Sequence, residues 1–125
     1  MPLSPGLHAC VKLVVSDEDT AVAHHSGDVP VLATPRLIAL CEEAAMTAVA
    51  GQLPEGKTTV GMRVQVDHLH PTNVGSTVAA EATLEKVEGR RLVFTVAVND
   101  HGGLVAAGKV TRVVVDTEQF LDKAR

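Results

Sequence analysis

Thr34, Glu42 and His68 are the three side chains whose types and spacing could carry out chemistry together. A hydroxyl can orient or polarise a carbonyl group, a carboxylate can act as a base or a nucleophile, and an imidazole can transfer protons near neutral pH. We expect the three to meet in one cleft, where they would suit hydrolytic acyl transfer: a nucleophile or an activated water attacks a carbonyl carbon. A helix and a strand must present them to the same space.

Each of these residues also has a purely structural interpretation. The Thr34 hydroxyl could cap a helix, and the Glu42 carboxylate could form an ion pair with Arg112 or Arg63. His68 could be a histidine that ends a strand or packs in the core. The residue types alone leave both interpretations open for all three positions.

Other reactive side chains give weaker indications. His68 and His70 share a strand face, but no Asp or Cys stands at a familiar spacing to supply a third metal ligand. Cys41 lies on an apolar helix beside two carboxylates, surroundings that raise the pKa of a thiol and make it a poor nucleophile. The glycines form no phosphate-binding loop. We therefore predict neither a metal nor a cofactor.

Residues 34–51 predict one long helix. Thr34 can cap its start, Pro35 suits its first turn, and Gly51 can end it. The residues between them are nearly all apolar or small, so we expect the helix to be buried on most sides. The Glu42 carboxylate should face protein rather than open water, because Glu42 falls on the apolar stripe that also holds Ile38, Ala45 and Val49.

Apolar patterns typical of strands recur along the chain, and the polar residues 16–33 predict a long connection that could serve as a lid. In residues 57–70, strict alternation puts His68 on one face with Val60, Met62, Val64 and Val66, and puts Gly61 on the other. We expect the apolar face to look at the helix. The predicted strands are residues 7–15, 57–70, 76–87, 90–99 and 104–116.

This order of elements indicates a single α+β domain over residues 1–125. The last four strands follow one another through turns, so an antiparallel sheet of about five strands wrapped around one long buried helix is the simplest arrangement. It is the layout of the hot-dog fold. Such a sheet has exposed edges, and we predict a homodimer in which a second copy covers one of them.

The composition argues against several classes of function. The 125 residues include 11 basic and 15 acidic residues, two Phe and no Tyr or Trp, with a net charge of −4, which disfavours nucleic-acid binding. Cys10 and Cys41 are too few and too far apart for a disulfide framework and are expected to pack as small hydrophobes in a reducing compartment. No secretory signal or bilayer-spanning apolar run is evident. We expect a cytoplasmic protein without a membrane partner.

Several motifs together resemble the fluoroacetyl-CoA thioesterase-like branch of the hot-dog superfamily. The resemblance covers roughly residues 30 to 120 and is carried most specifically by Thr34, Glu42 and His68 in this order and spacing. The other matching pieces are Ala33-Thr34-Pro35, Val60-Gly61-Met-Arg-Val-Gln-Val-Asp-His68, Pro71-Thr-Asn-Val-Gly75, Val87-Glu-Gly-Arg-Arg91 and Ala107-Gly-Lys-Val-Thr-Arg112-Val-Val-Val.

The resemblance implies a reaction and a set of residue roles. The reaction is hydrolysis of an acyl-CoA thioester to a carboxylic acid and free CoA, with Thr34, Glu42 and His68 as the catalytic set. His68 would handle protons and Thr34 would polarise the carbonyl, while Glu42 would either attack it or activate a water. The resemblance places Gly61 close to the bound acyl group and Arg112 near the catalytic region, so both are predicted to bind substrate.

One departure from the family concerns the acyl group. A selective pocket for a two-carbon acyl group is expected to have aromatic cover, and residues 16–33 contain no Phe, Tyr or Trp. We therefore expect a different or broader acyl group than fluoroacetyl. A non-catalytic hot-dog module that binds an acyl-thioester or another small ligand is the alternative. An enoyl-CoA hydratase is disfavoured, because Asp67 and His68 are adjacent and point to opposite strand faces.

Overall fold

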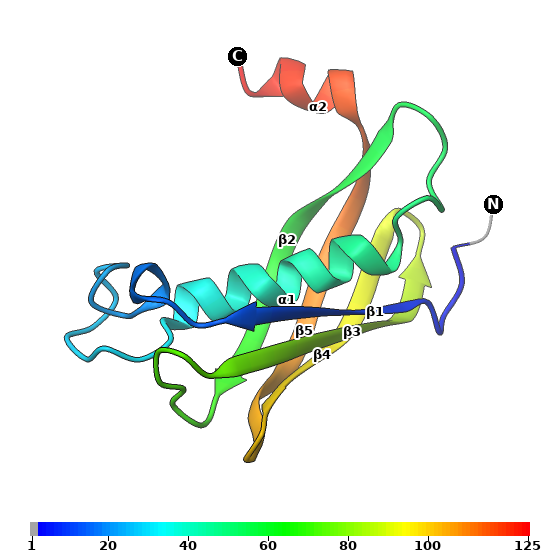
Figure 1. Cartoon of the computed structure of the whole chain (residues 1–125). Helices are drawn as coiled ribbons and strands as arrows, with labels where there is room; N and C mark the ends of the chain where they lie inside the picture. The colour runs from blue at the N-terminus through cyan, green and yellow to red at the C-terminus, as the bar shows by residue number, and fades with distance from the viewer. Residues whose placement is uncertain (1–2) are drawn as a thin grey trace.

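The computed structural model describes residues 3–125, and it contains one sheet, one long helix and two short helices in that part of the chain (Figure 1). The long helix follows the lid, and four strands follow the helix, as the sequence predicts. In chain order the elements are β1 (His8–Val14), η1 (Asp17–Asp19), α1 (Thr34–Ala48), β2 (Lys57–His68), β3 (Thr77–Glu88), β4 (Arg91–Asp100), β5 (Gly103–Asp116) and α2 (Thr117–Lys123).

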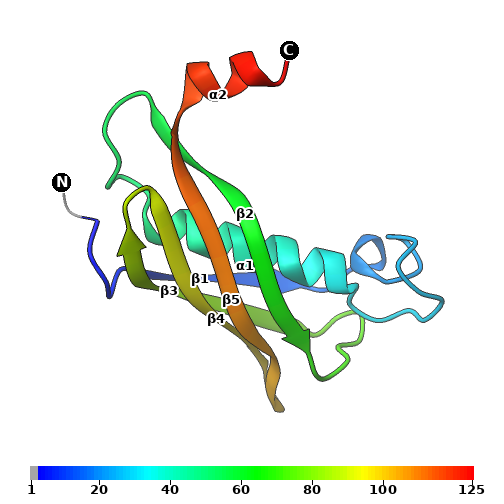
Figure 2. The ribbon, with the colours of Figure 1, turned by 180° about the vertical axis from the view of Figure 1, so that it is seen from behind.

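The five strands form one antiparallel sheet in the order β1-β3-β4-β5-β2, which leaves β1 and β2 at its edges. The sheet curls around α1. In the view from the back, β2 and β5 lie nearer the viewer and cross over the helix (Figure 2). Between helix and sheet lies an apolar core in which Leu37, Leu40, Phe94 and Val96 are almost completely buried. Burying each such side chain contributes about 1.5–3 kcal/mol, which is enough to fix the helix on this face. The predicted sheet and helix are confirmed.

The start of α1 differs from the prediction. Ala33 occupies the N-cap position with an extended backbone, and Thr34 and Pro35 are the first helical residues. Thr34 is therefore not the cap, and its hydroxyl is free to bond elsewhere. The interpretation of Thr34 as an N-cap is wrong because the extended chain turns into the helix one residue earlier.

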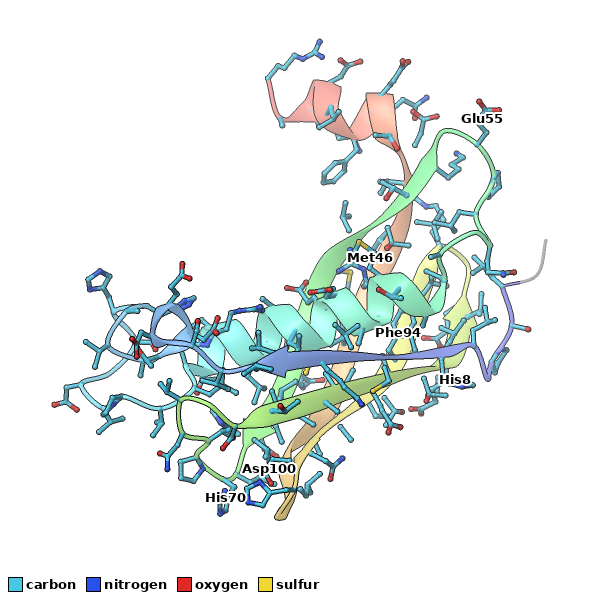
Figure 3. All side chains as sticks on the ribbon, in the orientation of Figure 1. His8, Met46, Glu55, His70, Phe94 and Asp100 are labelled. Atoms are coloured by element: carbon cyan, nitrogen blue, oxygen red, sulfur yellow. The ribbon has the colours of Figure 1, made fainter. Side chains whose placement is uncertain are left out.

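The prediction that α1 is buried on most sides is also wrong for the single chain. One face packs in the core, but the opposite face, with Ala39, Glu43, Met46 and Thr47, is exposed. Met46 is 48% exposed and lies on the opposite side of the helix from the core residue Phe94 (Figure 3). Apart from Glu43 and Thr47, the residues of this face are small or apolar, so the sequence pattern did not distinguish it from a buried face.

A β-bulge changes the facing of residues along β2. Gly61 pairs with Arg112 of β5, yet Arg63 already pairs with Thr111, so Met62 is the extra residue in β2. A bulge shifts the alternation of side chains by one. As a result Gly61 and His68 both face α1, which corrects the prediction that they lie on opposite faces.

The C-terminal helix α2 extends beyond the sheet at the end of β5 (Figure 1). The Asp116 carboxylate caps it by accepting a hydrogen bond from the backbone N–H of Gln119 (3.0 Å). None of the helices within residues 3–125 is both long and apolar enough to cross a bilayer.

Candidate functional site

Thr34 and His68 are brought into direct contact where the start of α1 meets the end of β2. Thr34 Oγ1 and His68 Nδ1 lie 2.8 Å apart, a hydrogen bond between residues 34 positions apart in the chain. Pro35 has no backbone N–H to donate in the first turn of α1. The backbone N–H of Leu37 donates to the Ala33 carbonyl oxygen and does not use the Thr34 hydroxyl as its acceptor. This local geometry leaves the Thr34 hydroxyl available to the imidazole.

The imidazole of His68 is partly enclosed. Its Nε2 atom is buried and has no hydrogen-bond partner among residues 3–125. Burial lowers the pKa of His68 below its ordinary value of 6.5, and the nearby backbone of His70 opposes this shift in part. His68 is therefore mainly neutral at neutral pH and can accept a proton.

The Thr34–His68 pair opens into a cleft under the lid, which we call the lid cleft. Its volume is about 310 Å³, large compared with a two-carbon acyl group, and its wall contains no aromatic residue other than histidine. The lining residues are Ala21, Ser26, Gly27, Val29, Val31, Leu32, Thr34, His68, Leu69, His70 and Pro71.

The base of the lid is tied to the first turn of α1. Asp19 accepts hydrogen bonds from the backbone N–H and hydroxyl of Ser16 (2.8 and 2.9 Å) and from Arg36 Nε (3.0 Å). Burial alone would raise the pKa of Asp19, but the bonds from Ser16 and Arg36 outweigh it and leave that pKa below 3.8. The backbone N–H of Ala33 also bonds to the Asp19 carbonyl (2.8 Å). The lid is thus anchored beside Thr34 rather than loose at its base.

Glu42 lies further along α1, against Arg112 of β5. Arg112 Nη1 lies 3.4 Å from Glu42 Oε2, while Arg112 Nε and Nη2 donate to the hydroxyl and the carbonyl oxygen of Thr59, each at 2.9 Å. The Arg112 side chain is 9% exposed and that of Glu42 is 35% exposed. Burial lowers the pKa of Arg112, and Glu42 opposes that shift. The predicted ion pair of Glu42 is therefore present, with Arg112 rather than Arg63 as its partner.

Gly61 gives the Glu42 carboxylate its space. A methyl group built on Gly61 would overlap Glu42 Oε2 and would lie 3.7 Å from Arg112 Nη1. These residues open into a second hollow of about 410 Å³, which we call the helix cleft. It is lined by Ala39, Glu42, Glu43, Met46, Thr59, Val60, Gly61 and Arg112.

The single chain thus brings together two of the three predicted catalytic residues and not the third. The lid cleft and the helix cleft share no lining residue. Thr34 and Glu42 are eight positions apart on α1, which corresponds to about 12 Å along the helix axis. Within one chain β2 meets α1 at two separate points, so the three side chains that we expect to share a cleft line two different ones.

Sequence reasoning missed Thr59 and the link between Asp19 and Arg36. An arginine directly before the apolar run Val113-Val114-Val115 of a predicted strand signalled a need for buried acceptors, and Thr59 supplies them. For Cys41 the expectation is confirmed: burial, with the Glu42 charge, raises the pKa of its thiol to about 11. Both cysteines are unpaired, but Cys10 is exposed, contrary to prediction, because β1 is an edge strand.

The sequence is similar to known thioesterases. Residues 15–118 match the profile of the fluoroacetyl-CoA-specific thioesterase family. Over 95 residues the chain is 36% identical to the fluoroacetyl-CoA thioesterase of Streptantibioticus cattleyicolor, which covers 76% of this chain and 68% of that protein.

Solved structures give the same result for the fold. A structure of the fluoroacetyl-CoA thioesterase FlK superimposes with a TM-score of 0.94 at 29% identity, covering 100% of this chain and 97% of that one. A hot-dog-like protein from Thermanaerovibrio acidaminovorans superimposes with a TM-score of 0.89 at 30% identity, covering 96% and 89%. The predicted hot-dog fold is confirmed.

Proposed function

This chain belongs to the fluoroacetyl-CoA-specific thioesterase family, and from that premise we propose that it hydrolyses an acyl-CoA thioester to a carboxylic acid and free CoA. The observation that carries the proposal is the Thr34–His68 hydrogen bond of 2.8 Å at the mouth of a cleft. In the reaction, the oxygen of a water ends on the carbonyl carbon, the C–S bond breaks, and the CoA sulfur takes up a proton.

We assign each residue a role that its surroundings permit. His68, whose burial keeps it mainly neutral, accepts the proton that the water gives up, directly or by way of Glu42, and passes it to the leaving sulfur. Thr34, bonded to that imidazole, orients or polarises the thioester carbonyl. Glu42 either attacks the carbonyl carbon, giving an anhydride that water then cleaves, or activates the water directly. Gly61 and Arg112 stay the predicted substrate-binding residues, and the bonds of Arg112 indicate that it acts largely through Glu42.

The acyl group is proposed to be larger or more varied than fluoroacetyl. A lid cleft of about 310 Å³ without Phe, Tyr or Trp offers no tight aromatic cover for a two-carbon group. Its wall instead combines small residues with aliphatic ones such as Val29, Val31 and Leu32. An acyl chain of several carbons would bury more apolar surface there than an acetyl group can.

A homodimer would complete the site. β2 is an unpaired edge strand, and the exposed face of α1 with Met46 lies beside it. If two β2 strands pair antiparallel about a two-fold axis near Val64, His68 of one copy comes beside Gly61 of the other. Glu42 of that second copy rests against its own Gly61, so it would approach the Thr34–His68 pair of the first. We therefore propose that each site takes residues from both copies.

We propose a cytoplasmic location from the state of the cysteines. Cys10 and Cys41 are both unpaired thiols, and Cys10 is exposed. Exposed thiols persist best in a reducing compartment.

The test is release of free CoA thiol from acyl-CoAs of graded length and polarity. Wild-type protein should hydrolyse at least one of them, and Glu42→Gln and His68→Gln should each lower kcat by about 100-fold or more while the fold stays intact by circular dichroism. Glu55→Gln and His101→Gln change exposed residues outside both clefts and serve as matched controls. A wild type that binds acyl-CoAs but hydrolyses none would favour the alternative, a non-catalytic binding module.

A further inference from the structure

Thr59 contributes two acceptors to one buried guanidinium. Its hydroxyl accepts from Arg112 Nε and its carbonyl oxygen from Arg112 Nη2, each at 2.9 Å. Both residues are buried, with Thr59 5% and Arg112 7% exposed. Two parallel bonds to one edge of a planar guanidinium fix its orientation, because the group cannot rotate without breaking both.

We propose that Thr59 is a positioning residue for Glu42: it orients Arg112 so that the third nitrogen, Nη1, meets Glu42 Oε2. The proposal rests on the proposed function, in which Glu42 is catalytic. The Nη1–Oε2 distance of 3.4 Å is long for an ion pair and Glu42 is 35% exposed, so the contact contributes direction more than strength. What holds the geometry is the pair of shorter bonds to Thr59.

The arrangement leaves one carboxylate oxygen for the reaction. Oε2 lies 3.4 Å from Arg112 Nη1 and against the bare Cα of Gly61. Oε1 has no hydrogen-bond partner within residues 3–125, and Glu42 lines the helix cleft. Catalytic carboxylates gain from such preorganisation, because a displacement of about 1 Å can cost roughly 100-fold in rate. Thr59 therefore acts on the Glu42 carboxylate through Arg112.

Valine at position 59 isolates the role of the hydroxyl. Thr59→Val keeps the β-branched shape and the backbone carbonyl but removes the acceptor of Arg112 Nε–H. We expect kcat for acyl-CoA hydrolysis to fall by about 10- to 100-fold with KM changed by less than about twofold. Thr59→Ser, which keeps the hydroxyl, should stay within about threefold of wild type. Thr58→Val is the matched control, because Thr58 is the adjacent residue of β2 and points to the other face of the sheet.

A second readout follows the contact itself. In ¹⁵N–¹H spectra the Arg112 Nε–H should exchange slowly with solvent in wild type and Thr59→Ser, and at least about tenfold faster in Thr59→Val. If Thr59→Val does not fold, Thr59→Ala, which leaves room for a water, takes its place in both measurements. Faster exchange together with lower kcat supports the proposal.

Three results would overturn it: unchanged kcat in Thr59→Val despite faster exchange, an equal loss of kcat in Thr58→Val, or a loss in Thr59→Ser as large as in Thr59→Val. Wild-type activity is measured first, so that failure of the proposed function is recognised separately. A wild type that hydrolyses no thioester removes the reaction and this role with it, whatever the exchange rates show.

Discussion

At the scale of single residues, two glycines of the β2–β5 pair differ in what surrounds them. Alanine at Gly61 would meet the flexible end of the Glu42 side chain, which can move aside. Alanine at Gly108 would overlap the Gln65 carbonyl and lie 2.7 Å from Val66 Cα, and that backbone cannot yield without opening the sheet. The same substitution should therefore damage activity at one position and stability at the other.

We expect Gly61→Ala to lower kcat by about tenfold or more while changing the free energy of unfolding by less than about 1 kcal/mol. Gly108→Ala should lower the free energy of unfolding by about 2 kcal/mol or more, or prevent folding. Urea denaturation and the thiol-release assay measure the two effects. Equal loss of stability in both variants would contradict the assignment of Gly61 to the space of Glu42.

His68 should give the reaction a pH dependence. Burial lowers the pKa of His68 below 6.5, so the imidazole is neutral above that pH and becomes charged as the pH falls through its folded pKa. If neutral His68 accepts the proton, kcat/KM should be level near pH 7 and decline below pH 6.5. Thr34 contacts the His68 imidazole, and His70 is the other histidine that lines the lid cleft.

The measurement is the pH–rate profile of wild type and of His70→Gln. The acidic decline should persist in His70→Gln, which removes the other histidine of the lid cleft. A profile that stays flat from acid to alkaline pH would exclude His68 as the proton acceptor.

At the scale of elements, the lid depends on one buried carboxylate. Asp19→Asn removes the negative charge that accepts hydrogen bonds from Arg36 Nε and from Ser16. We expect it to destabilise the protein by about 1–2 kcal/mol at pH 7. The loss is no larger because Arg36 is partly exposed, so that water screens the charge pair. The folded pKa of Asp19 is lowered, so its stabilisation is present above pH 3.8 and is lost as the pH falls through the folded value.

Unfolding by urea at several pH values tests this. Wild type and Asp19→Asn should differ at pH 7 and converge in acid, while Asp17→Asn, an exposed acid of the same short helix, should match wild type throughout. A difference that is independent of pH would show that the Asp19 charge is not what anchors the lid.

At the scale of the whole molecule, the shared site that we propose uses a second copy, because Glu42 and the Thr34–His68 pair line different clefts of one chain. If each site combines Glu42 of one copy with His68 of the other, a mixed dimer of Glu42→Gln and His68→Gln chains has one intact site and one doubly altered site. Random assembly of the two coexpressed chains makes about half of the dimers mixed, so the unsorted mixture should recover about a quarter of wild-type activity, although each variant alone is about 100-fold or more below wild type.

Sedimentation at micromolar concentration supplies the companion measurement, with a dimer as the expected species. If each site lay within one chain, the coexpressed variants would be no more active than either variant alone. A monomer with full activity would overturn both the dimer and the shared site.

The sequence by itself determined what neighbouring residues can encode. Alternation and helical periodicity gave five strands and one long helix at nearly their observed positions, and the types of Thr34, Glu42 and His68 indicated acyl-transfer chemistry. The poor nucleophilicity expected of Cys41 also followed from its immediate neighbours, and the raised pKa agrees with it. Such features depend on the local chain, so one sequence is enough to read them.

The tertiary structure decided how these pieces meet. The Thr34–His68 bond joins residues 34 positions apart, the Arg112–Glu42 contact 70, and the Arg112–Thr59 bonds 53. The bulge at Met62, which turns Gly61 toward α1, comes from pairing β2 with β5. Burial, strand register and the division into two clefts are set by distant segments packing together, and no periodicity within one segment records them.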